Sequence, residues 1–254
     1  MLIRLFEWED QPWLPRRLRG YLTELLRHQV GEVYLPALPI LTRWLAANEC
    51  RHVVDLCSGA GGPWPVLAAA MQESAPTVLF TDIHPYDGPV PADRGGYHPV
   101  PVDARSIPAE LVGCRTIFTG LHHFGRAEAR ELLRRAADER VPIAVFEFTE
   151  ARWRNVLGML LSPIVVWAQT PAIKPFRWGR LVWTYVLPVV PALYLWDGIV
   201  SHLRSYRVAD LESLATGLDR DGYGWEAGRV IVPSGGAPIT YLLGGRPAAS
   251  AGDG

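Results

Sequence analysis

The chain has 254 residues, and 25 lysines and arginines against 26 acidic residues leave a net charge of −1 at pH 7. This length suits a single catalytic domain, and we expect no nucleic-acid partner because the chain has no block of basic residues to neutralise phosphates. The cysteines are odd in number and lack metal-ligand spacing, and the first residues lack the pattern of a signal peptide. We therefore expect a cytoplasmic protein with no metal and with reduced cysteines at Cys50, Cys57 and Cys114.

The first 48 residues lie outside the pattern of alternating strands and helices that follows. They contain Trp8, Trp13 and an amphipathic helical pattern over residues 18–30. We expect this region to form a helical lid across the ends of the strands. Such additions often shape the site that a fixed core supports.

Residues 52–65, HVVDLCSGAGGPWP, pass from a buried strand directly into a loop of small residues. Val53 and Val54 suit a strand, and glycines allow a turn tight enough to approach a ligand. A helix is predicted over residues 66–71, with Pro65 in its first turn. Loop amides and a helix N-terminus that face one crevice are typical of a cofactor site.

The glycine spacing separates two cofactor classes. A dinucleotide fingerprint needs a third glycine where Trp64 stands. The pattern D-x-C-x-G-x-G instead resembles the first motif of class I S-adenosylmethionine-dependent methyltransferases, with a cysteine in place of the first glycine. This resemblance implies S-adenosyl-L-methionine as cofactor and contacts to it from Asp55, Cys57, Ser58, Gly59 and Gly61.

Two further acidic residues follow short apolar runs. Residues 77–83 lead to Asp82, about 20 residues beyond the loop, where carboxylates bind ribose hydroxyls in doubly wound folds. The alternative is that Asp82 only caps a turn. A third strand is predicted over residues 99–104. The resemblance implies that Asp103 and Ala104 lie beside the adenine and that Ile83 also contacts the cofactor.

The fourth predicted strand, residues 114–120, leads into the sequence LHHF. By resemblance this segment matches the fourth methyltransferase motif and lies against the methyl donor, which implies cofactor contacts from Thr119 and Leu121. His122 and His123 titrate near neutral pH, so either ring could take a proton from an acceptor. The alternative is that they only pack or form hydrogen bonds at a strand end.

The rest of the chain continues the alternation. We predict helices over residues 126–140 and 208–218 and strands over 142–149, 223–232 and 239–245. The fold class is therefore α/β, a doubly wound, mostly parallel seven-stranded sheet of the Rossmann-like methyltransferase type. The resemblance implies that the last strand is antiparallel. The carboxyl ends of parallel strands would bring Asp55, Asp82, Asp103 and His122 together.

Residues 151–207 form an insertion with apolar runs at 157–168 and 181–196 and five of the ten tryptophans. The longer run has 16 residues, fewer than the ~20 that span a bilayer. Three interpretations remain open for it: a pocket for an apolar acceptor, a homodimer interface, or attachment to a membrane surface.

Three polar residues of the insertion fall on one face of a predicted helix. Asp197, Ser201 and Arg204 have the i, i+4 and i, i+7 spacing that places them together. They either orient an acceptor or form an ion pair within the helix. We predict acceptor contacts from these three residues together with Trp183 and Trp196.

The resulting functional prediction is methyl transfer from S-adenosylmethionine to a small, apolar or aromatic acceptor within a single domain. One alternative is a nicotinamide-dependent reductase, against which Trp64 and the presence of a single lysine, Lys174, both argue. Another is a methyltransferase-like protein that binds without catalysing.

Overall fold

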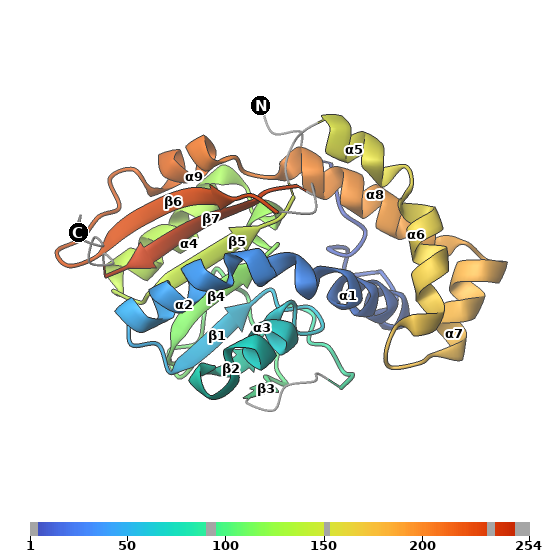
Figure 1. Cartoon of the computed structure of the whole chain (residues 1–254), viewed down its shortest axis with the longest axis horizontal. Helices are drawn as coiled ribbons and strands as arrows, with labels where there is room; N and C mark the ends of the chain where they lie inside the picture. The colour runs from blue at the N-terminus through green and yellow to red at the C-terminus, as the bar shows by residue number, and fades with distance from the viewer. Residues whose placement is uncertain (1–4, 90–94, 150–152, 233–236, 247–254) are drawn as a thin grey trace.

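A twisted seven-stranded sheet forms the centre of the molecule (Figure 1). The computed structural model describes residues 5–89, 95–149, 153–232 and 237–246. The strands are β1 His52–Leu56, β2 Thr77–Phe80, β3 Gly95–Tyr97, β4 Cys114–Phe118, β5 Ile143–Glu147, β6 Gly224–Val230 and β7 Ile239–Gly245. Their order in the sheet is β3-β2-β1-β4-β5-β7-β6.

The direction of each strand confirms the predicted fold class. β1 pairs in parallel with β2 and with β4, and β2–β3 and β4–β5 are also parallel. β7 is antiparallel to both β5 and β6, as the resemblance implies. The carboxyl ends of the parallel strands therefore meet at one edge, where ligands bind in open α/β sheets.

Helices and short helical turns cover both faces of the sheet and extend beyond it. They are α1 Arg16–Val30, η1 Glu32–Ala37, α2 Leu38–Ala47, α3 Trp64–Met71, η2 Gln72–Ser74, η3 Leu121–His123, α4 Arg126–Asp138, α5 Trp153–Met159, α6 Ser162–Gln169, η4 Thr170–Ala172, α7 Trp178–Leu181, η5 Val182–Val186, α8 Val189–Arg204 and α9 Val208–Ala215.

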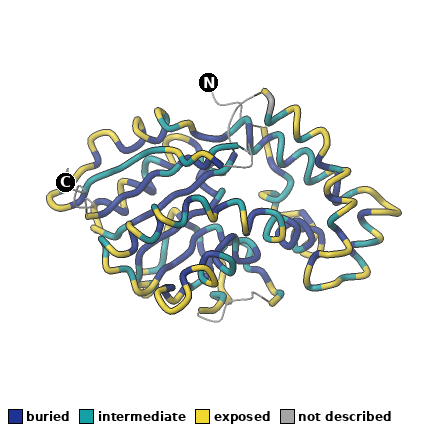
Figure 2. The backbone as a smooth tube through the Cα atoms, in the orientation of Figure 1, coloured by how far each residue is buried: buried dark blue, intermediate teal, exposed yellow. Residues whose placement is uncertain are grey.

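Side chains of neighbouring strand residues point to opposite faces of the sheet, and the hydrophobic core is therefore divided into two clusters. Val53 faces a cluster with η1, α2 and α3, whereas Val54 faces a cluster with α4 and α9. One short apolar run therefore stabilises both layers. Figure 2 shows the central strands as the most continuously buried part of the chain.

α1 and the insertion form a separate group of helices beyond the sheet (Figure 1). Leu18, Leu22 and Leu25 of α1 lie on one helix face and pack in a third apolar cluster with Val166 of α6 and Val190 of α8. This spacing is that of an amphipathic helix. α1 therefore stands between the insertion and the ends of the strands.

The predicted third strand is wrong in its position. β3 spans Gly95–Tyr97, and residues 99–104 form no strand. Pro99 and Pro101 lack the backbone donors that a strand ladder needs, which explains the difference. The last strand has its predicted bounds, and the other predicted elements are present with ends that differ by a few residues.

The prediction that all cysteines are reduced is also wrong. Cys50 precedes β1, Cys114 begins β4, and these neighbouring strands are in register at Val53 and Cys114. The structure joins Cys50 and Cys114 in a disulfide with a Cα–Cα distance of 5.9 Å. The two cysteines lie 64 residues apart in the sequence, so only the strand pairing reveals their proximity.

The apolar run at residues 181–196 is divided between two helical segments. Among the described residues, no single helix has the length and hydropathy of a membrane span. The segments Trp178–Val186 and Val189–Arg204 reach that length and hydropathy only when taken together. The chain is bent by 78° at the break between them.

Candidate functional site

A cavity of about 350 Å³ lies at the carboxyl ends of β1, β2 and β4. One wall consists of the loop after β1 and the segments after β2, β3 and β4. The opposite wall comes from the N-terminal region, including Glu9, Asp10 and the α1 residues Arg19, Thr23 and Arg27. The cavity has the size and position expected of a small-molecule site in this kind of fold.

The loop after β1 presents its backbone to the cavity. Cys57, Ser58 and Gly59 line the wall, whereas Gly61 does not. Gly59 has φ +50°, a conformation that glycine adopts at little cost. The Ser58 hydroxyl donates to the Asp55 carbonyl over 2.7 Å, which fixes the loop to the end of the strand.

Asp55 points into the core and is not among the residues that line the cavity. Its carboxylate accepts hydrogen bonds from the Thr116 hydroxyl at 2.6 Å and from Trp64 Nε1 at 3.0 Å. Burial raises the pKa of Asp55 to about 7, although these two donors act against the shift. In this structure Asp55 therefore anchors the loop and does not face a ligand.

Asp82 and Ile83 line the cavity directly after β2. One Asp82 oxygen accepts the Gly59 amide at 2.9 Å, and the other accepts the His84 amide at 2.8 Å. Burial raises the pKa of Asp82, while the two amides favour its ionised form. Each oxygen can accept a further hydrogen bond, so the carboxylate can still bind a ligand hydroxyl.

Asp103 and Ala104 also line the cavity, although they lie in a turn and not at a strand end. The Asp103 carboxylate accepts the Arg105 amide and pairs with the Arg105 guanidinium at 2.7 Å. These hydrogen bonds lower the pKa of Asp103 and hold its carboxylate ionised. Val102 places an apolar side chain on the same wall.

The end of β4 adds aromatic residues to the cavity. Thr119 lines the wall with φ +51° and forms a hydrogen bond with the hydroxyl of Tyr34. Phe118 and Phe148 pack edge-on against the Tyr34 ring. Leu121 does not line the cavity, but its amide donates to Glu147 Oε1 at 2.7 Å.

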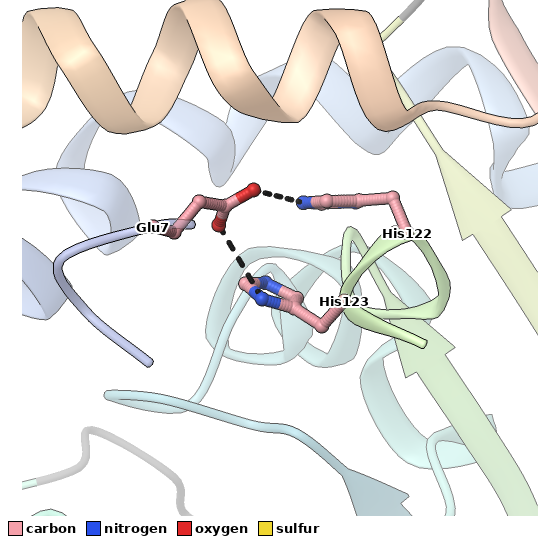
Figure 3. A group of neighbouring side chains, drawn as sticks. All are labelled: Glu7, His122 and His123. Carbon is pink, nitrogen blue, oxygen red and sulfur yellow. Dashed lines mark ion pairs between the residues drawn. The ribbon is translucent and has the colours of Figure 1, made fainter. Parts of the chain in front are cut away.

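Both histidines point toward Glu7 (Figure 3), but their other neighbours differ. His122 is 2% exposed, and its Nδ1 lies 2.7 Å from Glu147 Oε2. His123 lines the cavity, and its Nδ1 lies 2.8 Å from Asp10 Oδ1 and 3.3 Å from Glu7 Oε2. Only His123 is therefore placed to meet a molecule in the cavity.

The charge of His123 depends on its neighbours. Burial alone would lower its pKa, but the carboxylates of Glu7 and Asp10 outweigh burial and raise the pKa to about 10. The same contacts, assisted by Arg204, overcome burial and lower the pKa of Asp10 to about 2. At neutral pH this ring is thus an imidazolium, which donates hydrogen bonds and does not accept protons.

Glu7, His122 and His123 also have the spacing of a metal site, with potential ligand atoms within 4.8 Å of one another. However, Arg204 Nη1 lies 3.3 Å from Glu7 Oε1 and 3.4 Å from Asp10 Oδ2. This guanidinium and the His123 imidazolium already balance the charges of Glu7 and Asp10. These residues therefore already form an ion-pair network.

The insertion residues expected to bind the acceptor lie elsewhere. Trp183 packs against α1 and α8, and Trp196 Nε1 donates to the Phe6 carbonyl over 2.9 Å. Asp197 accepts the Trp8 amide at 2.7 Å and the Glu9 amide at 3.1 Å. None of the described insertion residues lines this cavity.

Ser201 and Arg204 lie outside the cavity and contact residues in or next to its wall. The Ser201 hydroxyl donates to Glu7 Oε1 at 3.3 Å, and Arg204 Nη2 donates to the His123 carbonyl at 2.7 Å. The predicted face of Asp197, Ser201 and Arg204 therefore exists, but it binds the N-terminal segment, defined here as residues 5–14. In the structure these residues position the cavity wall and do not form it.

Sequence reasoning missed the residues on the N-terminal side of the cavity. Glu7, Asp10 and Tyr34 come from a region that was expected only to cover the site. The acidic pair at Glu9 and Asp10, among aromatic residues, was the available signal. Glu7 and Asp10 pair with His123 and Arg204, which are more than 100 residues away, so the pairing itself could not be predicted from the sequence.

Comparison with known proteins supports the fold. No protein-family model matches the sequence, and no curated protein matches it either. The solved structure of the plantazolicin methyltransferase BpumL in complex with SAH is similar, with a TM-score of 0.54 and 10% identity over 94% of this chain and 92% of that one. The structure of TnmH has a TM-score of 0.52 and 16% identity over 94% of this chain. This chain spans 61% of TnmH.

The chain therefore has the fold of the class I S-adenosylmethionine-dependent methyltransferases. The sheet order and the antiparallel β7 agree with that fold. The parallel sheet typical of nicotinamide-binding proteins has no such strand in this position, which weakens the reductase alternative.

Proposed function

We propose that this chain transfers a methyl group from S-adenosylmethionine to a small acceptor with an apolar or aromatic part. The observation that carries the proposal is the hydrogen bond between the Gly59 amide and the Asp82 carboxylate at the cavity wall. It joins the glycine-rich loop to Asp82, the carboxylate that is expected to bind the ribose hydroxyls. The two lie at the ends of adjacent strands, as in sites that bind nucleoside cofactors.

The residues present fit that cofactor. Asp82 offers a carboxylate to vicinal hydroxyls, and Val102 and Ala104 offer an apolar surface to a planar base. Gly59 lines the cavity without a side chain, which lets a ligand approach the loop backbone closely. S-adenosylmethionine supplies a methyl group already activated on a sulfonium. The protein then has mainly to align the acceptor and exclude water.

The acceptor side of the proposal depends on the aromatic end of the cavity. Tyr34, Phe118, Phe124 and Phe148 contribute rings to the lining of the cavity. Aromatic side chains supply large rigid contacts and favour flat or apolar partners. An acceptor of that kind would have its polar end near His123, the titratable group that lies beside these rings on the cavity wall.

His123 would act on the acceptor in two ways. As an imidazolium it donates a hydrogen bond to an acceptor oxygen and helps that oxygen to ionise. Its pKa falls when positive charge enters the cavity, because like charges disfavour the protonated ring. After the imidazolium has released its proton to solvent, the neutral ring can accept the proton of the acceptor, an effect that typically contributes about 10²- to 10⁴-fold to the rate.

Calorimetry with S-adenosylmethionine, S-adenosylhomocysteine and reduced nicotinamides tests the proposal against its alternatives. We expect both sulfur compounds to bind and the nicotinamides not to bind. Binding of the nicotinamides alone would favour a reductase. Binding of the sulfur compounds without methyl transfer to a broad panel of phenols, amines and acids would favour a non-catalytic binding protein.

A matched pair of glycine variants makes the test specific to the loop. Gly59→Val should abolish binding of S-adenosylhomocysteine, because φ is +50° and the loop backbone faces the cavity. Gly217→Val is the control, since Gly217 also has positive φ but open space around it and lies outside the cavity. Equal binding by both variants would contradict the proposal.

A further inference from the structure

The outer surface of the insertion is unusually apolar. Of the 21 large apolar side chains that are exposed among the described residues, 13 belong to residues 153–187. Trp153, Trp178 and Val186 are 75%, 77% and 72% exposed, and Leu161 and Ile164 are each 62% exposed. We call this surface, formed by the exposed apolar side chains of residues 153–187, the apolar face. A concentration of exposed apolar side chains in one segment is typical of an interaction site.

The short elements of the insertion have an inner and an outer side. Val166 and Ile173 are fully buried against α1 and α8, and Thr184 is also fully buried. The apolar face lies on the outer side of the same elements, and Figure 2 shows exposed backbone along much of this end of the molecule. Helices with one packed side and one outward apolar side suit a flat apolar partner.

The lengths of these elements limit how the apolar face can meet such a partner. α5, α6 and α7 contain seven, eight and four residues. A helix needs about 20 residues to cross a bilayer, so these elements fit a surface and do not fit a span. Each would lie in the plane of an interface with its apolar side chains immersed.

The excess of basic over acidic residues in the insertion favours a negatively charged surface as its partner. Residues 151–196 contain five arginines and lysines and no acidic residue. Arg177 and Arg180 both pair with Glu24, at 2.7 Å and 2.5 Å, whereas Lys174 is exposed. Trp153, Trp167 and Tyr185 are exposed on the apolar face, and such residues gather at the boundary between lipid headgroups and chains.

We propose that the apolar face docks on the surface of an anionic phospholipid bilayer. The proposal is independent of the proposed methyl transfer, because none of its residues lines the cofactor cavity. A second copy of the chain is the rival occupant, but residues 151–196 of that copy carry no acidic side chain that could pair with Lys174. Anionic headgroups instead attract an exposed basic side chain such as that of Lys174.

Vesicle co-sedimentation with the full chain tests the proposal. We expect binding to phosphatidylcholine vesicles that contain phosphatidylserine and at least about tenfold weaker binding to phosphatidylcholine alone. Added salt should weaken the binding without abolishing it, because the apolar contribution remains. Tryptophan fluorescence should shift to shorter wavelength when the vesicles are added, because exposed indoles leave water.

Two double variants distinguish vesicle binding through the apolar face from nonspecific binding through other exposed apolar side chains. Trp178→Ser combined with Val186→Ser should weaken vesicle binding by about tenfold or more, since it removes two large apolar contacts. Val112→Ser combined with Ile231→Ser is the control, because these side chains are 80% and 75% exposed outside the insertion. The control should bind vesicles like the original chain.

Lys174→Glu isolates the charge contribution. It should lower the preference for phosphatidylserine and leave binding driven by apolar contact. The proposal is overturned if the original chain does not bind either vesicle, or if both serine pairs weaken binding equally. It is also overturned if light scattering shows a stable dimer that only the Trp178→Ser and Val186→Ser pair dissociates.

Discussion

The backbone amide of Gly59 donates to a carboxylate oxygen of Asp82 over 2.9 Å and thereby joins the loop after β1 to the end of β2. Both residues line the cavity, so this hydrogen bond fixes two parts of the proposed cofactor site relative to each other. A second amide, that of His84, holds the other Asp82 oxygen. The carboxylate is therefore oriented before any ligand arrives.

Replacement of Asp82 by alanine should weaken S-adenosylhomocysteine binding by about 1.5–3 kcal/mol, or roughly 10- to 150-fold. The reason is the loss of hydrogen bonds between a charged carboxylate and the ribose. Calorimetry measures the change. Glu49→Ala is the control, because Glu49 pairs with Arg246 away from the cavity. Unchanged affinity in a folded Asp82→Ala protein would contradict the ribose assignment.

Replacement of Asp197 by alanine should loosen the N-terminal segment, because the Trp8 and Glu9 amides lose their acceptors. We expect faster proteolysis near the N-terminus and a higher KM for the acceptor, with a smaller effect on cofactor affinity. Asp210→Ala is the control, since Asp210 binds Arg207 and Arg126 instead. Equal proteolysis of the two variants would show that Asp197 does not hold the segment.

The stability of the protein should depend on the charge of His123. Its pKa is about 10 in the folded state against 6.5 for the free side chain. The stabilisation it contributes is complete below pH 6.5 and is lost as the pH rises through 10. Chemical denaturation should therefore show the free energy of unfolding falling between pH 7 and pH 9. His123→Gln should flatten this slope, and an unchanged slope would contradict the assigned charge.

Reduction of the disulfide between Cys50 and Cys114 should lower the free energy of unfolding by about 2–4 kcal/mol, because the bond constrains the unfolded chain. Denaturation with and without a reducing agent measures the change. Cys50→Ser should match the reduced protein. A thiol assay of the oxidised, unfolded protein should find one thiol, Cys57, and three thiols would show that the bond is absent.

Much of the sheet and one wall of the cavity could be predicted because both depend on local sequence. Val53, Val54 and Asp55 mark the end of a buried strand within a few residues, and residues 77–83 do the same. The resemblance implies cofactor contacts from Cys57, Ser58 and Gly59 and a position of His123 near the methyl donor, and the spacing after the loop predicts a ligand contact from Asp82. All five residues line the cavity.

The remaining features depend on contacts between distant segments. Asp55 has the expected position at a strand end, but Thr116 and Trp64 turn its carboxylate inward. Trp183 and Trp196 were expected at the acceptor, yet neither lines the cavity. No spacing along the chain gives the relative position of α1 and α8. The ion pair between Glu7 and His123 could not be predicted from the sequence for the same reason.

The N-terminal segment and the strand ends contribute to the cavity in different ways. The strand ends belong to the buried core, where a substitution disturbs packing in both layers. The N-terminal segment is held mainly by hydrogen bonds and aromatic contacts to α8. Under the proposed function, mutations in these few residues would alter acceptor choice while the sheet remains intact. Diversification of substrate range within a lineage would then be concentrated in this part of the chain.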